Sequence, residues 1–319
     1  MDNIIEKYRT KNKCSQELLN IIEKIIYAFT TVLGEKYIDK ILEAFNKLAI
    51  YEFGTIEEAG EISNNYFNNG KKYRYSIIAQ GGGIAEDDYY IDNDGKLQQK
   101  FIVLISKGEY TESKIQLIVH GICHVLSSLN LPELDGNILH TKSGVSETSY
   151  EFDGKYKGKI LKNTNTLFNE IITENLAMQV MDTYNQTVKH PPESYNGVVA
   201  SFRAIFRSEA LNRIIIDDYM DNTEHYLDAI NNLFQPENIQ QAVREISDRL
   251  NTENTNIKNF LESLYKMSVQ EFFSYYFEIL KNFMIRPKDI DRETYKVMKQ
   301  ITIEVVRILG RNLELQKKL

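Results

Sequence analysis

Two histidines, His120 and His124, lie four residues apart in the segment IVHGICHVLSSLN. On a helix this spacing places both side chains on one face, one turn apart. Two imidazoles in this arrangement are a common pair of metal ligands, although chance pairs make the spacing weakly specific by itself. The pair therefore predicts a metal site only if another segment supplies further ligands.

A pair of acids has the same spacing further along the chain. Glu170 and Glu174 lie one helical turn apart in the segment FNEIITENLAMQV. Zinc in catalytic sites takes three protein ligands and leaves a fourth position open, and His, His and Glu form one of its standard sets. A second acid one turn from the ligand is suited to hold a ligand histidine through its other ring nitrogen. The alternative is that both glutamates are solvated residues on a helix surface.

The histidine segment has the pattern of an amphipathic helix. We expect this helix to begin near Thr111 or Ser113, with Ser113 and Gln116 as a capping box, and to end around Asn130. At about 100° per residue, the histidines lie roughly opposite the apolar stripe, beside Gln116 and Ser127. The stripe consists of Ile115, Ile118, Val119, Ile122, Val125, Leu126 and Leu129.

The acidic segment predicts a second helix, from about Leu167 to Tyr184. Its glutamates share a face with Thr173 and Ala177, while a separate set of side chains serves the core. The core set is Phe168, Ile171, Ile172, Leu176 and Val180. The carboxylates are therefore placed to meet the histidines of the first helix.

The rest of the chain indicates an α+β fold that is mostly helical. Residues 4–49 predict two or three helices separated near Gly34. The segments YRYSIIAQ (73–80) and KFIVLIS (100–106) predict buried strands, with QGGG and DNDG as turns. Residues 131–166 are expected to form loops with a short hairpin, and residues from about 197 to 319 are helical in pattern. We expect an N-terminal helical segment (1–50), a lobe with a small mixed sheet and both motif helices (51–186), and a helical C-terminal lobe (187–319).

The two motifs together carry a resemblance. HGICH and NEIITE are similar to the HExxH and NExx(S/T)(D/E) motifs of the thermolysin-like zinc metallopeptidases, the gluzincins. The resemblance implies a zincin-like fold in which His120, His124 and Glu170 bind Zn²⁺ and Glu174 hydrogen-bonds a ligand histidine. Asn169 also matches the second motif. The implied two-lobed arrangement extends from about residue 73 to the C-terminus, and the implied partner is a peptide or protein.

Gly121 departs from this family, which has a glutamate after the first histidine. In the family that glutamate is the general acid and base, a role worth about 10²- to 10⁴-fold in rate. Glycine in mid-helix also costs about 1 kcal/mol relative to alanine. Three explanations are open: an inactivating replacement, natural or introduced, of an ancestral glutamate; room for a partner's backbone to approach; or a neutral relic in a protein that cleaves nothing. We expect position 121 to border the metal cleft with space for a glutamate, and Glu147 and His140 are the nearest substitute bases in sequence.

Other reactive side chains have plainer interpretations. Cys123 beside a histidine suggests a nucleophile, but a catalytic Cys and His normally come from different segments, so we expect a small helix-packing residue. His190 and His225 are expected at the surface or at helix caps. Tyr184 and Tyr195 are weak candidates for oxyanion stabilisation, as downstream Tyr or His residues are in the resembled family.

Composition limits the classes of function. The chain of 319 residues has a net charge of −7 and a pI near 5.5, which argues against a nucleic-acid surface. It has neither an apolar run of about 20 residues nor a secretory leader pattern, so we expect a cytoplasmic protein that does not act at a membrane. Two cysteines are too few for a disulfide framework, although a single bridge stays open.

Three hypotheses follow from these patterns. The first is a peptide-binding or regulatory pseudoenzyme that keeps a zinc triad and lacks the catalytic glutamate. The second is an active metal-dependent peptidase that is present here in inactivated form or that uses another base. In either case we expect a peptide to lie along the edge of the strand before the first motif helix. The third is a helical interaction scaffold without metal.

Overall fold

The structure is a computed structural model that describes residues 2–68, 70–72, 83–129, 132–164, 166–185, 209–281 and 290–316. It divides into two compact units. Unit 1 comprises Met1–Thr164 and Leu176–His190, and unit 2 comprises Asn165–Asn175 and Pro191–Leu319. Helix α6 (Thr166–Asn185) is continuous, so its first half belongs to unit 2 and its second half to unit 1.

Unit 1 begins with helices, as the sequence predicts. They are α1 (Asp2–Thr10), α2 (Gln16–Leu33), the short η1 (Glu35–Tyr37) and α3 (Ile38–Lys47). Ser15 caps α2 by accepting a hydrogen bond from the Leu18 amide, and Gly34 ends it at a positive φ of 80° that favours glycine. The expected break near Gly34 is confirmed. Helix α3 packs against α5, which carries the histidines.

A small mixed sheet, sheet A, supports the site. Its order is β1-β3-β2, formed by β1 (Leu48–Phe53), β2 (Gly83–Ile91) and β3 (Leu97–Ser106). Strand β3 lies between a parallel partner, β1, and an antiparallel partner, β2. The strand predicted at 100–106 and the turn at 92–95 are confirmed, because β3 covers the first and the Gly95 amide donates to the Asp92 carbonyl in the second. The strand predicted at 73–80 lies outside the described residues, and β2 was not predicted.

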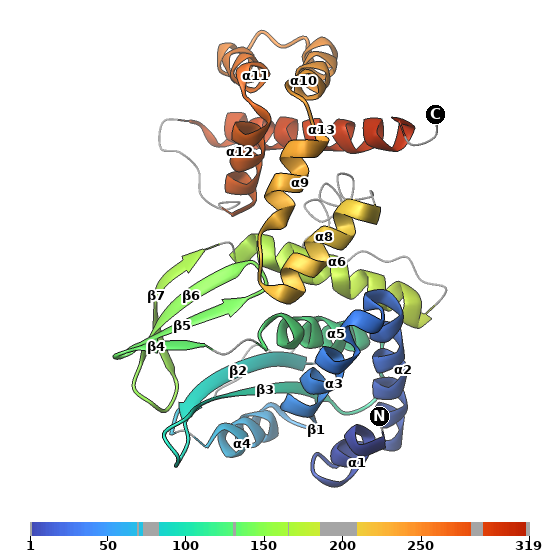
Figure 1. Cartoon of the computed structure of the whole chain (residues 1–319), viewed down its shortest axis with the longest axis vertical. Coiled ribbons are helices and arrows are strands. Elements are labelled where there is room, and N and C mark those ends of the chain that lie inside the picture. The colour runs from blue at the N-terminus through green and yellow to red at the C-terminus, as the bar shows by residue number, and fades with distance from the viewer. Residues whose placement is uncertain are drawn as a thin grey trace. The chain divides into compact units, whose positions relative to one another are not determined.

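Helices cover both faces of sheet A (Figure 1). Helix α4 (Ile56–Phe67) packs on the face that carries Ile102 and Leu104, where a cluster of buried apolar side chains forms. Helix α5 (Glu112–Ser127) packs on the opposite face, against β2 and β3. Because side chains alternate along a strand, Val103 on β3 and Ala85 on β2 point toward α5.

The expectation of loops with a short hairpin for residues 131–166 is wrong. The described part of this segment forms a four-stranded antiparallel meander, sheet B, of β4 (Glu133–Asp135), β5 (Ile138–Ser143), β6 (Ser146–Phe152) and β7 (Lys157–Thr164). Its strands are polar, and only a few side chains, such as Leu139 and Phe152, are buried in a small cluster with Tyr89 of sheet A. A sheet with so small a core lacks the apolar alternation by which strands are detected.

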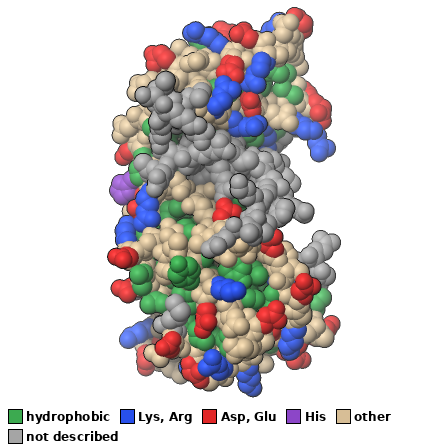
Figure 2. Space-filling model, turned by 90° about the vertical axis from the view of Figure 1, so that its right-hand side faces the viewer, with side chains coloured by type: hydrophobic (Ala, Val, Ile, Leu, Met, Phe, Trp, Pro, Cys, Tyr) green, Lys and Arg blue, Asp and Glu red, His purple; other side chains and the backbone are tan. Residues whose placement is uncertain are grey.

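Unit 2 is helical in its described part, as the sequence predicts. Its helices after α6 are α8 (Glu209–Asp221), α9 (His225–Leu233), α10 (Pro236–Leu250), α11 (Thr255–Lys266), α12 (Val269–Lys281) and α13 (Arg292–Gln316). Acidic and basic side chains are interspersed on the face of the molecule that Figure 2 presents. Ion pairs such as Arg311–Glu245 and Arg249–Glu304 join α13 to α10.

The described residues therefore form a mostly helical α+β fold with two small sheets. None of the described helices combines the length and the apolar character that crossing a membrane requires.

Candidate metal centre

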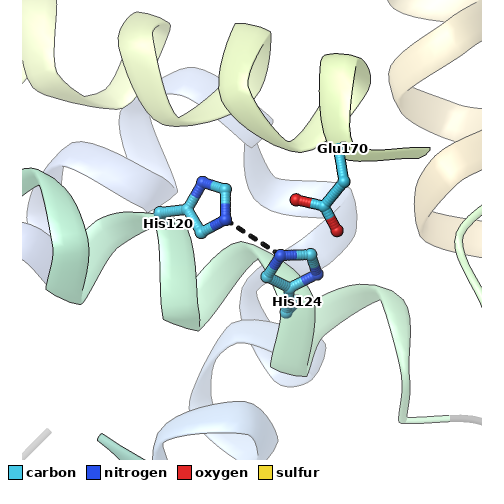
Figure 3. Close-up of side chains that lie close together, drawn as sticks. All are labelled: His120, His124 and Glu170. Carbon is cyan, nitrogen blue, oxygen red and sulfur yellow. Dashed lines mark hydrogen bonds between the residues drawn. The ribbon is translucent and has the colours of Figure 1, made fainter. Parts of the chain in front are cut away.

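The structure brings the predicted ligands His120, His124 and Glu170 together. Each offers one donor atom, and these atoms all lie within 4.8 Å of one another. Figure 3 shows the imidazoles of α5 and the carboxylate of Glu170 on α6 pointing toward one another. All three side chains are partly buried. The cluster is therefore close enough to hold a metal ion.

The two imidazoles present the same ring nitrogen to each other. His120 Nε2 and His124 Nε2 are 3.0 Å apart, and the rings are inclined by 73°. One ring donates a hydrogen bond and the other accepts it. Two nitrogens bound to Zn²⁺ at ~2.0–2.1 Å in a tetrahedron lie about 3.3 Å apart, so the pair is nearly spaced for a shared metal.

Helix α5 buries its apolar stripe, as expected. All seven stripe residues are at most 9% exposed, whereas both histidines are partly exposed. Ser127, which was expected on the outer side, is buried, and its hydroxyl donates to the His124 carbonyl and lies 3.1 Å from Ser143 Oγ. The Gly144 amide donates to the Ser127 carbonyl, so the β5–β6 turn fixes the last turn of α5.

The start of α5 differs from the prediction in one respect. The N-cap is Thr111, which was one of the two expected positions, and the capping box of Ser113 and Gln116 is wrong. The Thr111 side chain makes no capping hydrogen bond and instead lies 3.0 Å from Ser113 Oγ.

Helix α6 is more buried than its pattern suggests. Ile171, Ile172, Leu176 and Val180 are fully buried, as expected of the core set, and the side chain of Phe168 lies outside the described residues. Thr173 and Ala177, on the face of the glutamates, are also fully buried, and Glu174 is only 7% exposed. Glu174 is therefore not a solvated surface residue.

The hydrogen bond between Glu174 and a ligand histidine, which the motif implies, stays a prediction. Since His120 presents Nε2 to His124, its Nδ1 is the ring atom left for an outer partner. Both His120 Nδ1 and Glu174 Oε2 are buried atoms. A buried carboxylate one helical turn from Glu170 on α6 suits the proposed hydrogen bond to a ligand histidine.

Gly121 packs against sheet A, which contradicts the expectation of open space at this position. A Cβ atom added to Gly121 would lie 2.9 Å from Val103 Cγ2 and 3.0 Å from Ala85 Cβ. Real Cβ atoms essentially never show a contact under 3.0 Å, so the Val103 side chain, the strand or the helix would have to shift. None of the three explanations for glycine anticipated this packing, because the groups that approach Gly121 are the side chains of Val103 and Ala85 in the protein's own sheet.

The sequence did not single out an ion pair on the α5 side of sheet A. Asp87 on β2 shares the face of Ala85, because the two are separated by one residue along the strand. Lys157 Nζ of β7 lies 2.6 Å from Asp87 Oδ1. Burial alone would raise the pKa of Asp87, but the Lys157 ammonium, hydrogen bonds from Lys157 and Gln99, and the charge of His124 together hold it below its ordinary value.

Lys157 is fixed in turn by its surroundings. Its side chain is 16% exposed and stacks over the rings of Tyr89 and Tyr150. Burial, the largest single effect, would lower the pKa of Lys157, but the charge and hydrogen bond of Asp87 together with the charges of Tyr150 and Asp88 outweigh it, and the net shift is upward. The nearest sequence signal was the acidic run EDD in residues 86–88, which cannot show where its partner lies.

The other reactive side chains named from the sequence are not part of the triad. Cys123 is fully buried on α5, and both it and Cys14 are free thiols, which excludes a disulfide between them. His140 on β5 is exposed and bonds to Ser149, while Glu147 on β6 pairs with Lys142.

Two of the downstream candidates can be placed. His225 is exposed and bonds through Nδ1 to the buried Asp218, which also accepts from the Tyr226 amide at the start of α9. This arrangement confirms the expectation of a surface or capping residue. Burial raises the pKa of Tyr184 on α6. His190 and Tyr195 lie outside the described residues.

Comparisons of this chain with known protein families, with curated proteins and with solved structures gave no match. The resemblance to the gluzincins therefore rests on the two motifs and on the cluster they form. What the structure establishes is a possible metal-binding triad of His120, His124 and Glu170.

Proposed function

We propose that this protein binds one Zn²⁺ ion through His120 Nε2, His124 Nε2 and a carboxylate oxygen of Glu170. The convergence of these three donors within 4.8 Å is the observation that carries the proposal. Two imidazoles and one carboxylate suit Zn²⁺ and leave its fourth position open for water or a ligand group. At neutral pH the ion would act there as a Lewis acid.

We further infer that the protein is a metallopeptidase-like pseudoenzyme. Position 121 carries no carboxylate to take a proton from bound water, and a side chain there would collide with Val103 and Ala85. The carboxylate of Asp87 is held ionised by Lys157, so it is a poor proton acceptor. The earlier candidates His140 and Glu147 already bond to neighbours within sheet B.

The partner we propose is a peptide or an extended segment of a protein. The strand before α5 is β3, which is bonded on both sides and has no free edge, so the expected docking on that strand is wrong. In the part of the chain that the structure describes, β2 is an edge strand of sheet A and lies against α5. A peptide paired with β2 would add main-chain hydrogen bonds, and one of its oxygens could take the open metal position.

Metal content of the purified protein tests the first part of the proposal. We expect about one zinc per chain in the wild type and none in His124→Ala. His140→Ala is the matched control, because it removes an exposed imidazole from β5 and should retain the metal. A wild-type protein that holds no zinc and gains no thermal stability on adding it at neutral pH would exclude the site and favour a metal-free scaffold.

Cleavage of an unfolded protein substrate by the zinc-loaded wild type tests the second part. We expect no cleavage above that of His124→Ala. Chelator-sensitive cleavage by the wild type would overturn the pseudoenzyme proposal and support an active peptidase that uses another base.

A further inference from the structure

A buried hydroxyl chain lies beside the third ligand. Thr173, between Glu170 and Glu174 on α6, is fully buried, and its Oγ1 donates to the Asn169 carbonyl over 2.9 Å. The same Oγ1 lies 2.7 Å from the hydroxyl of Tyr219 on α8. Since the threonine proton is directed to Asn169, Tyr219 donates to Thr173. The chain runs from Tyr219 through Thr173 to the carbonyl that directly precedes Glu170.

This chain acts on the helical turn that carries the ligand. A threonine hydroxyl that bonds to the carbonyl four residues earlier adds a second donor to that carbonyl and tends to bend a helix. The Tyr219 side chain is fully buried, so its ring has one position and its hydroxyl requires a partner. The Tyr219 hydroxyl on α8 therefore fixes the orientation of the Thr173 hydroxyl on α6.

A second contact joins the same two helices. Asn175 Nδ2 donates to Asn212 Oδ1 over 3.2 Å, and Asn175 is 3% exposed. Residues 173 and 175 flank Glu174, so α8 bonds to α6 on both sides of that acid. These contacts, like Glu170 itself, lie within unit 2.

We propose that Tyr219 is a positioning residue for the metal centre: through Thr173 it sets the α6 turn that places the Glu170 carboxylate. The inference rests on the proposed metal-binding function. Zinc–oxygen bonds are ~2.0–2.2 Å long, and functional groups must be held within about 0.5 Å of their productive positions, so a small change in this turn alters coordination. Tyr219 is one of 20 tyrosines and has no motif around it, which is why the sequence does not reveal it.

Co²⁺ binding to the full chain tests this role, because the absorption spectrum of the ion reports its coordination geometry. Tyr219→Phe and Thr173→Val each remove one hydroxyl and keep the shape. We expect both to weaken Co²⁺ binding by about tenfold and to change the visible spectrum. Thr173→Ser keeps the hydroxyl and should restore both. Tyr276→Phe is the matched control, since it removes a hydroxyl from another fully buried tyrosine of unit 2, on α12.

The outcomes separate the two proposals. If Tyr219→Phe binds Co²⁺ with the affinity and spectrum of the wild type, the positioning role is refuted while the metal site stands. Equal changes in Tyr219→Phe and Tyr276→Phe would show a general loss of stability and refute it as well. If the wild type itself binds neither Co²⁺ nor Zn²⁺, the proposed function fails and this inference fails with it.

Discussion

His120 Nε2 and His124 Nε2 face each other at 3.0 Å, a hydrogen bond for which one of the two rings must supply the N–H proton. A metal ion held by both rings needs the lone pairs of both nitrogens. Binding of the ion and retention of that proton therefore exclude each other. Protonation of the two histidines is therefore coupled to metal binding.

Zinc affinity should consequently depend on pH. We expect the dissociation constant for Zn²⁺ to rise as the pH is lowered from about 7.5 to about 5, because imidazoles ordinarily gain protons in that range and must lose them to bind metal. Calorimetry in buffers of different ionisation enthalpy would count the protons released. A dissociation constant that does not change with pH would show that the imidazoles are not the ligands.

Substitution of Gly121 by alanine should destabilise the protein, although alanine is the better helix former. Helix propensity favours Gly121→Ala by about 1 kcal/mol. Overpacking against Val103 and Ala85 typically costs about 1–3 kcal/mol, so we expect a net loss of roughly 0–2 kcal/mol in the free energy of unfolding. Urea denaturation measures this change, and Gly121→Glu should lose more.

A double-mutant cycle identifies the cause. Val103→Ala removes the methyl group that Gly121→Ala would meet, so alanine at 121 should cost less in that background than in the wild type. An increase in stability of Gly121→Ala in the wild-type background would mean that the sheet yields easily and that glycine is not required for packing.

Loss of the Glu174 carboxylate should weaken the metal site and preserve the fold. We expect Glu174→Gln to raise the zinc dissociation constant by ~10- to 100-fold, because an amide does not provide the charge-assisted hydrogen bond that a ligand histidine receives from a carboxylate. Metal competition with a chromophoric chelator measures the constant. An unchanged value would assign Glu174 to packing alone.

Removal of the Asp87 charge should destabilise unit 1. Breaking a fully buried ion pair costs about 3–5 kcal/mol. The Asp87 side chain is 34% exposed, so we expect Asp87→Asn to lose only ~1–2 kcal/mol at pH 7. Asp94→Asn, in the exposed turn between β2 and β3, is the control and should change stability by less than about 0.5 kcal/mol.

The effect of Asp87→Asn should also depend on pH. The pKa of Asp87 is held below its ordinary value of 3.8, so its contribution is complete above that pH and is lost as the pH falls through the lower folded value. The pKa of Lys157 is raised above 10.5, so its contribution is lost only as the pH rises beyond that value. Stability curves of wild type and variant should run parallel from pH 5 to 9 and converge in acid. Convergence near neutral pH would contradict this assignment.

The sequence predicted those parts of the fold that bury a periodic apolar face. Ile118 and Ile122 on α5, and Ile172 and Leu176 on α6, repeat at helical spacing, and all four are fully buried. The ligand triad was predicted from spacing and from a family resemblance, and the structure brings its three donors together. Periodicity succeeds here because each helix has a large core to face.

Features that depend on contacts between distant segments could not be predicted. Sheet B has a small core, so its strands lack the alternation that marks a buried face. The close packing of Gly121 on Val103 depends on how α5 lies on sheet A. The partners Asp87 and Lys157 are 70 residues apart, and Tyr219 is 46 residues from Thr173. No local pattern encodes such pairs.

Helix α6 contributes its first half to unit 2 and its second half to unit 1. A single cut of the chain therefore cannot release either unit whole. A chimera that takes one unit from this protein and the other unit from a second protein would therefore join two different sequences in the middle of this helix.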